Sequence, residues 1–344
     1  MRKKTWLFWA AAATVVAIGG TFTYASIAKI HTKIHTKITI SAASVQAAKG
    51  MELRFSQPVR SVRWTYNGQH HRTSLPTPQT TVWLNANLPQ NAKVTFSVDA
   101  ATGRFGNSLA KPAAFSEVTP APLYVMTNPG IYQYNVPVSG PFTLKFSAPV
   151  ANRAAVAQDI SFQPPVPGKL VWTSGSLASF VPSNPIPPTQ PELMTIRGGL
   201  KGPQGSSGQY LSADVKRPFI TASDQLIVVK ESKPETLTLY KNGKAVFKTL
   251  ANTGIPGAAT PKGHFYIRSM ALYANMRGTE PNGQPYYSPH VPWVMGLFGN
   301  IAIHGYIRSS YGFPQSVGCV ELPVKQARIL YHMVKVGTPV DIQS

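Results

Sequence analysis

The sequence predicts a mainly β protein. We expect an N-terminal transmembrane helix, two β-sandwich domains, and a C-terminal mixed, sandwich-like β domain with a late helix. Three observations support this fold class. Short alternating polar and apolar segments, separated by Pro, Gly and Asn, fill most of the chain. A seven-residue motif occurs twice in the middle of the chain. Helical spacing of apolar residues appears near the C-terminus, just before a glycine.

The composition limits the classes of partner. Hydrophobic residues make up 43% of the 344 residues, enough for packed cores, so a disordered chain is excluded. Lys and Arg number 33 against 12 Asp and Glu, and the net charge of +21 predicts attraction to polyanions. The basic residues are spread out and form no nucleic-acid-binding motif. We therefore expect anionic cell-wall polymers or anionic lipid as partners, and no nucleic acid.

The first 28 residues are predicted to be a signal anchor or a signal peptide. Arg2, Lys3 and Lys4 precede an uncharged, mostly apolar stretch at residues 6–25, which is long enough to span a bilayer. The basic cluster favours a cytoplasmic N-terminus, with the rest of the chain outside. We favour an uncleaved anchor followed by a basic linker at residues 29–46. A cleaved, secreted form is the alternative.

The middle of the chain contains a duplication. Leu53-Arg-Phe-Ser-Gln-Pro-Val59 recurs as Leu144-Lys-Phe-Ser-Ala-Pro-Val150. Each copy begins a stretch of short alternating strands, a pattern typical of antiparallel β-sandwiches. We therefore expect one sandwich at residues 47–120 and a second at residues 121–222.

Both copies resemble bacterial Ig-like modules, whose first strand often carries an apolar-x-Phe-Ser-x-Pro-Val pattern. Such modules are expected to act as spacers that hold the C-terminal domain away from the membrane. Lone tryptophans in a sandwich usually pack in its core. A carbohydrate-binding role is the alternative for Trp64, Trp83 and Trp172.

The pattern changes at residue 223, where a third domain is expected to extend to residue 344. Asn242-Gly243 is a strong signal for a two-residue turn between two strands. Apolar residues from Val324 to Val334 recur at helical spacing, with Pro323 at the start and Gly337 beyond the end. Strands are predicted at residues 225–230, 235–240, 244–250, 263–268 and 300–304.

The single cysteine, Cys319, is a candidate nucleophile. It lies in Ser316-Val317-Gly318-Cys319-Val320, downstream of His304-Gly305 at the end of a predicted strand. A thiol becomes a strong nucleophile when an imidazole takes its proton, and Gly-rich turns leave backbone N–H groups free for an oxyanion. The pattern indicates acyl transfer through a thioester. One cysteine also excludes an internal disulfide.

Residues from about 224 to 342 resemble the L,D-transpeptidase family with the YkuD-type catalytic domain. The resemblance implies a bacterial, extracytoplasmic enzyme with a mixed, mostly β domain. Such an enzyme cross-links peptidoglycan between the third residues of two stem peptides, or attaches another amine there, and carbapenems typically acylate its cysteine. The matching motifs are Leu237-Thr-Leu-Tyr-Lys-Asn-Gly243, Asn252-Thr-Gly254, Thr260-Pro-Lys-Gly263, Ile303-His-Gly305, Ser316-Val-Gly-Cys319 and Gly337-Thr-Pro-Val340.

The resemblance also implies roles for the site residues. His304 would take the proton of Cys319, either directly or as a resting ion pair, and later protonate the leaving group. The backbone carbonyl of Gly305 would fix the imidazole tautomer. Backbone N–H groups around Gly318 and Cys319 would hold the oxyanion, and Ser316 would order the loop. No metal and no cofactor are expected.

Two positions depart from the family pattern. The residue before Gly318 is often His and is here Val317, and the residue after Val320 is commonly Arg and is here Glu321. Glu321 reverses the local charge and could meet an acceptor ammonium.

A long insertion at residues 273–294 lies between two predicted strands of the third domain. Its aromatic character suggests a substrate lid, and a loop with its own small core is the alternative. We expect substrate contacts from Tyr287, His290 and Trp293.

The leading prediction is a monomeric, membrane-anchored cysteine acyltransferase that faces the cell wall. It would form 3→3 cross-links in peptidoglycan, using stem peptides as substrates. The same thioester could instead be hydrolysed, which would make the protein an L,D-carboxypeptidase or endopeptidase. A non-catalytic, cationic wall-binding protein is the alternative from another class. Sortases and papain-like wall hydrolases are disfavoured, because their cysteine motifs or their order of Cys and His differ.

Overall fold

The computed structural model describes residues 37–344. The predicted transmembrane helix at residues 6–25 and most of the basic linker lie outside the described residues. Within residues 37–344, no helix is long and apolar enough to cross a membrane. The described chain forms two compact units: residues 37–122 with Gln204–Tyr210, and Leu123–Pro203 with Leu211–Ser344.

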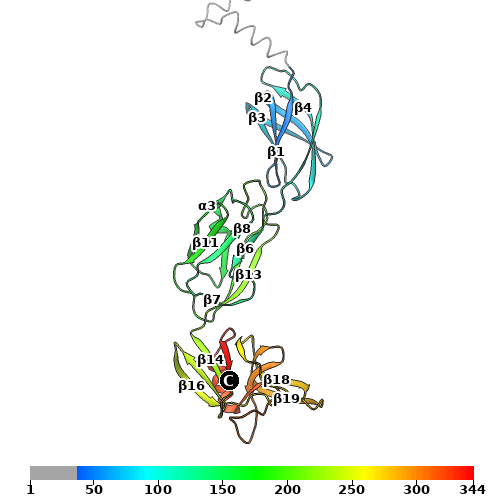
Figure 1. The fold of residues 1–344 in the computed structure, drawn as a ribbon. Helices are drawn as coiled ribbons and strands as arrows, with labels where there is room; N and C mark the ends of the chain where they lie inside the picture. Colours follow the sequence, from blue (N-terminus) through cyan, green and yellow to red (C-terminus); the bar gives the residue numbers. More distant parts are fainter. Residues whose placement is uncertain (1–36) are drawn as a thin grey trace, which may run out of the picture. The chain divides into compact units, whose positions relative to one another are not determined.

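The first unit is built on one five-stranded antiparallel sheet (Figure 1). Its long strand β2 pairs with β1 through its first half and with β4 through its second half, and β3 follows it along both. Register shifts around Val59 bend β2 between the two halves. One bent sheet thus replaces the two separate sheets expected of a sandwich. The strands are β1 (Ile40–Gln46), β2 (Gly50–Tyr66), β3 (Gln69–Asn85), β4 (Lys93–Gly103) and β5 (Ala113–Val118).

Residues 123–222 form two four-stranded sheets, ordered β10-β11-β8-β6 and β7-β13-β12-β9. Phe142, Phe162 and Phe219 from both sheets meet in a buried core. The strands are β6 (Val125–Asn128), β7 (Gln133–Val136), β8 (Phe142–Phe146), β9 (Ile160–Gln163), β10 (Gly168–Trp172), β11 (Leu177–Pro182), β12 (Pro191–Ile196) and β13 (Val215–Thr221). Short helices α3 (Arg153–Val156) and η1 (Ala157–Asp159) precede β9.

The duplicated motif has the same role in both places. Leu53, Phe55 and Val59 are buried in the first unit, and the equivalent Leu144, Phe146 and Val150 are buried in the second. Apolar residues two apart point to the same face of a strand, so the motif places two anchors in each core. The two copies therefore share the same buried positions as well as the same sequence pattern.

The C-terminal part combines a five-stranded sheet, a four-stranded sheet and one helix. The five-stranded sheet has the order β16-β15-β14-β22-β17, and the four-stranded sheet β18-β19-β20-β21. Residues from both sheets and from α4 share one core. The elements are β14 (Gln225–Lys230), β15 (Thr236–Lys241), β16 (Lys244–Leu250), β17 (Gly263–Tyr266), β18 (Ser269–Thr279), β19 (Pro285–Phe298), β20 (Ile301–Gly305), β21 (Val320–Leu322), α4 (Val324–Met333) and β22 (Pro339–Gln343).

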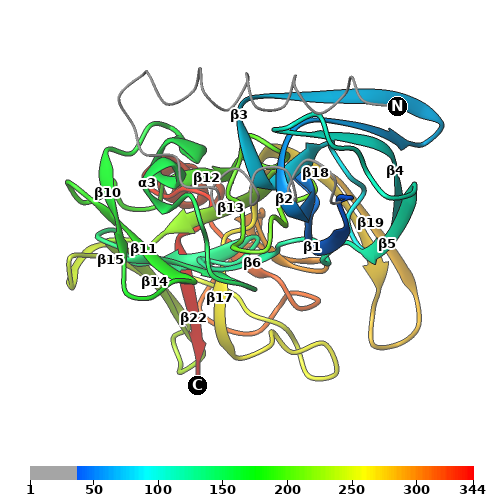
Figure 2. The ribbon, with the colours of Figure 1, turned by 90° about the horizontal axis from the view of Figure 1, so that it is seen from above.

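Several local expectations agree with these elements. Asn242 and Gly243 have φ angles of 49° and 74°, as the turn between β15 and β16 requires. The late helix starts after Pro323 and ends before Gly337, whose φ is 95°. The insertion at residues 273–294 differs from expectation. It forms most of an antiparallel hairpin, β18–β19, instead of an irregular loop (Figure 2).

Candidate active site

The register of two neighbouring strands brings the candidate catalytic residues to one face. β20 pairs in parallel with β21, with His304 opposite Glu321 and Ile303 opposite Val320. Cys319 lies in the bend directly before β21, and its side chain lines the same cavity as those of His304 and Glu321. The strand pair and this bend thus bring His304 and Cys319 to one cavity.

This face borders a cavity of about 170 Å³. His304 and Cys319 both line it. The lining also includes the paired charges of Arg308 and Glu321 and the carboxylate of Glu280. Among residues 37–344, no group of His, Cys, Asp and Glu could hold a metal ion. The lining residues are Met276, Glu280, Tyr286, Ser288, Val291, His304, Tyr306, Arg308, Ser316, Val317, Cys319 and Glu321.

The imidazole of His304 is 3% exposed and is held by the backbone. Its Nδ1 lies 3.1 Å from the carbonyl oxygen of Gly305. A carbonyl can only accept, so Nδ1 carries the hydrogen and Nε2 is left to take a proton. Burial lowers the pKa of His304 below its usual value, against the opposing effect of the Gly305 bond. The ring is therefore a neutral base at neutral pH.

The thiol of Cys319 is also buried and neutral. Burial raises the pKa of Cys319 to about 11, although a hydrogen bond from the backbone of Ala302 acts in the opposite direction. Its S–H donates to the carbonyl oxygen of Asn300, at a distance of 3.5 Å. No hydrogen bond joins this sulfur to His304 in the described part of the chain. The geometry favours a neutral thiol beside a neutral base over a resting thiolate–imidazolium pair.

The loop before Cys319 is closed by a serine and a glycine. The hydroxyl of Ser316 donates to the Cys319 carbonyl at 2.5 Å and accepts the N–H of Gly318 at 3.1 Å. Gly318 has a φ of 102°, which side-chain-bearing residues rarely adopt. One of the N–H groups expected to hold an oxyanion is therefore engaged by Ser316 here.

A second segment supports this loop from behind. Asn252 exchanges two backbone hydrogen bonds of 2.9 Å with Glu321, and the Thr253 carbonyl accepts the N–H groups of Gln315 and Ser316. The hydroxyl of Thr260 accepts the N–H of Gly254. Motifs far apart in the sequence thus meet around the nucleophile loop.

Arg308, which sequence reasoning missed, neutralises Glu321. Its Nε and Nη2 donate to the two carboxylate oxygens of Glu321, both at 2.8 Å. The pair lies in the cavity wall, with Glu321 only 5% exposed. A carboxylate next to the nucleophile would have been a usable signal, because a buried charge requires a partner. The charge reversal at Glu321 is therefore compensated from the loop after β20.

The hairpin residues expected to contact substrate have other positions. Tyr287 is 62% exposed, and the ring of His290 lies near Tyr273. Trp293 packs against Tyr331 and His332 of α4. None of these three residues lines the cavity beside Cys319. The same hairpin instead contributes Met276, Glu280, Tyr286, Ser288 and Val291.

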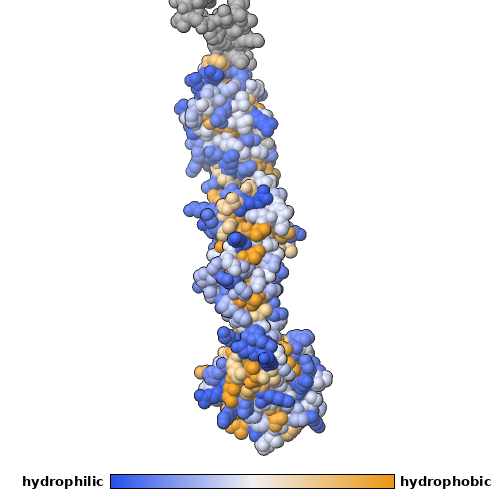
Figure 3. Space-filling model, turned by 90° about the vertical axis from the view of Figure 1, so that its left-hand side faces the viewer, coloured by the Kyte–Doolittle hydropathy of each residue, from blue (hydrophilic) through white to orange (hydrophobic). Residues whose placement is uncertain are grey.

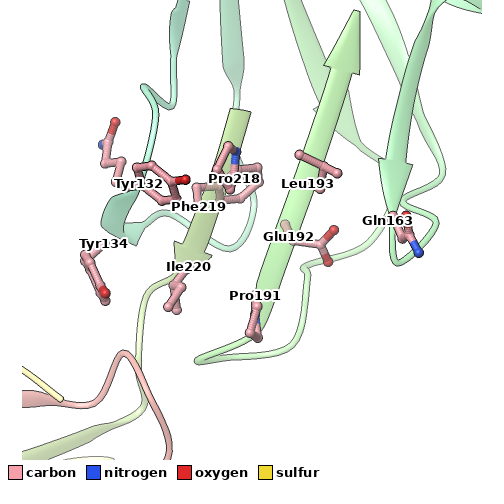
Figure 4. Close-up of a pocket in the computed structure, with 10 residues that line it drawn as sticks. Tyr132, Tyr134, Gln163, Pro191, Glu192, Leu193, Pro218, Phe219 and Ile220 are labelled. Carbon is pink, nitrogen blue, oxygen red and sulfur yellow. The ribbon is translucent and has the colours of Figure 1, made fainter. Parts of the chain in front are cut away.

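A different cavity, of about 330 Å³, lies on residues 132–220. Figure 4 shows Tyr132 beside Pro218 and Phe219 on one side, and Glu192 near the strand that carries Gln163 on the other. The carboxylate oxygen Oε2 of Glu192 has no hydrogen-bond partner in the described chain. The lining contains no Cys, Ser or His, so this cavity offers no thiol, serine hydroxyl or imidazole.

A buried thiol and a neutral imidazole that line one cavity are the parts of a cysteine acyl-transfer site. The model of the L,D-transpeptidase catalytic domain matches residues 224–342, and that of the bacterial Ig domain matches residues 42–202. The chain therefore carries an L,D-transpeptidase catalytic domain preceded by a bacterial Ig-like region.

Several known proteins are similar to this chain. L,D-transpeptidase 1 of Mycobacterium tuberculosis is 23% identical over 223 residues, covering 60% of this chain and 80% of that protein. A solved L,D-transpeptidase from Mycobacterium smegmatis is 22% identical and covers 65% of this chain and 100% of its own, with a TM-score of 0.36. L,D-transpeptidase 3 from Mycobacterium tuberculosis, solved with a faropenem-derived adduct, is 21% identical, with coverages of 64% and 98% and a TM-score of 0.37.

Proposed function

We propose that the protein is a peptidoglycan L,D-transpeptidase that forms 3→3 cross-links through a thioester on Cys319. The observation that supports this proposal is that His304 and Cys319 line the same small cavity, next to the paired strands β20 and β21. The match to the L,D-transpeptidase catalytic domain supports stem peptides as the substrates.

The first half of the reaction makes the thioester. The thiol of Cys319 turns from Asn300 towards His304, whose Nε2 takes the proton. The sulfur then attacks the carbonyl of stem residue three, forming an S–C bond. The C–N bond to the terminal residue breaks, and the protonated His304 returns the proton to the departing amine. The energy of the broken amide is kept in the thioester, so no nucleotide is needed.

The second half transfers the acyl group. The side-chain ammonium of a neighbouring stem first loses a proton to solvent. The resulting amine attacks the thioester, an N–C bond forms and the S–C bond breaks. His304 takes a proton from the attacking amine and passes it to the departing sulfur, so that Cys319 is regenerated as a thiol. Glu321 is paired with Arg308, so the rim carboxylate of Glu280 is the charge available to attract the incoming ammonium.

The first unit supports an additional role in holding anionic wall polymers. Arg63 and Arg72 lie directly opposite each other on β2 and β3, beside His70 and His71. Asp99 lines the same hollow and offsets one of these two charges. The remaining positive charge favours a polyanion that binds between the two guanidinium groups. The visible face of this unit is largely hydrophilic (Figure 3). Sedimentation with purified wall polymer should weaken in an Arg63→Gln/Arg72→Gln variant.

We also propose that the protein lies outside the cytoplasm and is held at the membrane by an N-terminal anchor. The substrates of this enzyme family lie outside the cytoplasmic membrane, and the basic, then apolar, N-terminal sequence supports export with retention. Fractionation of cells followed by N-terminal sequencing distinguishes an anchored chain from a cleaved, secreted one.

The proposed reaction is tested with the full-length protein in detergent and a disaccharide-tetrapeptide. A transpeptidase yields 3→3 dimers, whereas tripeptide without dimers means that water is the acceptor. No product from a folded, soluble protein would reject both reactions and favour a wall-binding role. The Cys319→Ala variant is the control, and dimers formed by that variant would contradict the mechanism.

A further inference from the structure

The cavity beside Cys319 contains one buried, bidentate ion pair. Arg308 donates from Nε and Nη2 to the two oxygens of Glu321, both at 2.8 Å. Nη2 also donates to the carbonyl oxygen of Gln315, at 3.1 Å. The guanidinium lies over the ring of Tyr306, 4.7 Å from its centre. Four contacts therefore hold the guanidinium in one position.

One nitrogen of Arg308 is left over. A guanidinium has five N–H donors, and the contacts above use those of Nε and Nη2. Nη1 makes no hydrogen bond within residues 37–344, although the side chain is only 31% exposed. Arg308 lines the same cavity of about 170 Å³ as Cys319 and His304. Nη1 is therefore the donor of Arg308 that remains for a small anionic group in this cavity.

The neutralising partner is itself rigid. Backbone bonds to Asn252 fix Glu321 on both its N–H and its carbonyl, and its side chain is 6% exposed. Glu321 acts on the pKa of His304 in the opposite direction to Arg308. The paired charges thus present a guanidinium donor to the cavity without a large net charge beside the neutral thiol and imidazole.

We propose that Arg308, positioned by Glu321, is the specificity residue that binds the carboxylate of the donor's leaving residue through Nη1. This inference rests on the proposed function. In a tetrapeptide donor, the terminal carboxylate belongs to the residue directly after the attacked carbonyl, so it enters the cavity with the scissile bond. Arg recognises carboxylates with directed N–H groups, and a charge-assisted bond is stronger than a neutral one.

The test compares two donors that differ only in the terminal group: a tetrapeptide stem with a free carboxylate, and the same stem with a carboxamide. The wild-type full-length protein should favour the carboxylate donor by about tenfold or more in kcat/KM, as expected for one charge-assisted hydrogen bond. In an Arg308→Gln/Glu321→Gln variant, two neutral amides replace the charged pair. The preference should fall to within about threefold.

Two further variants keep the test decisive. Arg277→Gln removes an exposed arginine of β18 that lies outside the cavity lining, and it should keep the wild-type preference. If the double variant does not fold, Arg308→Lys replaces it. Lysine keeps the positive charge that pairs with Glu321, but it has no second nitrogen that could also bind the donor carboxylate. The preference for the carboxylate donor should therefore fall again. An unchanged preference in either cavity variant, or none in the wild type, overturns the inference.

Binding to the inactive protein separates this inference from the proposed function. On a Cys319→Ala background, the dissociation constants of the two stems should differ about tenfold with Arg308 present, and converge in the double variant. This comparison needs no turnover. If the wild-type protein turns over both donors equally, the carboxylate role of Arg308 is contradicted and the transpeptidase reaction is not. If it turns over neither donor, the transpeptidase reaction is contradicted, while a retained difference in affinity still supports Arg308 as a carboxylate site.

Discussion

Glu235 holds Thr253 through two hydrogen bonds, accepting its N–H at 2.7 Å and its hydroxyl at 2.9 Å. The carboxylate is buried, and burial raises the pKa of Glu235 above its usual value against the effect of the Thr253 bonds. Thr253 in turn accepts the N–H groups of Gln315 and Ser316. A residue at the start of β15 therefore fixes the loop that carries Cys319.

Removing this carboxylate should loosen the site. We expect Glu235→Ala to lower the free energy of unfolding by about 2 kcal/mol, because two buried donors lose their acceptor. Glu235→Gln can keep both bonds, with its carbonyl on the Thr253 N–H and its amide on the hydroxyl, and should cost less than half as much. Urea denaturation followed by fluorescence measures both variants. Equal stability of the two would show that the bonds do not support the fold.

The pH dependence of acylation should follow His304. Burial lowers the pKa of this imidazole below 6.5, so the neutral, proton-accepting form persists as the pH falls past that value. The acylation rate should therefore fall less between pH 7 and 6.5 than it would for an imidazole of ordinary pKa, and reach half of its plateau only below pH 6.5. Stopped-flow acylation by meropenem gives the profile. His332→Gln, an exposed histidine of α4, should leave it unchanged, and an acid limb above 6.5 would contradict the neutral-base assignment.

Gly318 should tolerate no side chain. Its φ is 102°, and an added Cβ would lie 3.1 Å from Cδ1 of Ile301. Gly318→Ala should slow acylation at least tenfold, because the loop must shift Cys319 relative to His304. Gly243→Ala is the matched control, since Gly243 also has a positive φ but has open space around it. If both variants lose acylation equally, the effect is one of general stability.

Glu280 should govern the acceptor and not the donor. Glu280→Gln removes the exposed carboxylate of the cavity lining, so the KM for an amine acceptor should rise about 1.5-fold to fivefold, as expected for an exposed charge contact. Acylation in the absence of acceptor should stay at the wild-type rate. Dimer formation at varied acceptor concentration measures the first effect. The matched control is Glu117→Gln, an exposed glutamate of β5. An unchanged acceptor KM in Glu280→Gln would leave that amine without an assigned partner.

The sequence predicted the parts of the site that depend on local chemistry. His304 at a strand end, the Ser316–Cys319 turn and the helix at Val324–Met333 follow from residue types at short range. The Arg308–Glu321 pair was not predicted, because it joins residues 13 apart through a loop with no periodic pattern. The support from Glu235 to Thr253 is a contact of the same long-range kind.

The hairpin β18–β19 stands where the aromatic character of residues 273–294 suggested a lid or a loop. Pro285, Pro289 and Pro292 fall within β19, and a proline has no N–H to donate to a ladder. In the structure, residues 285–292 pair only with β18, so the other edge needs no donors. A register shift between Ala274 and Met276 takes up the irregularity. The prolines are tolerated because this part of β19 is at the edge of the sheet, and the sequence alone does not show which strand is at an edge.

The central claim is that the thiol of Cys319 becomes acylated with His304 as its base. The most direct measurement is mass spectrometry of the full-length protein after incubation with meropenem at pH 7, with peptide mapping. The account predicts one adduct, located on Cys319, that is absent in Cys319→Ala and forms far more slowly in His304→Gln. An adduct at another residue, or equal rates with and without the imidazole, would contradict it.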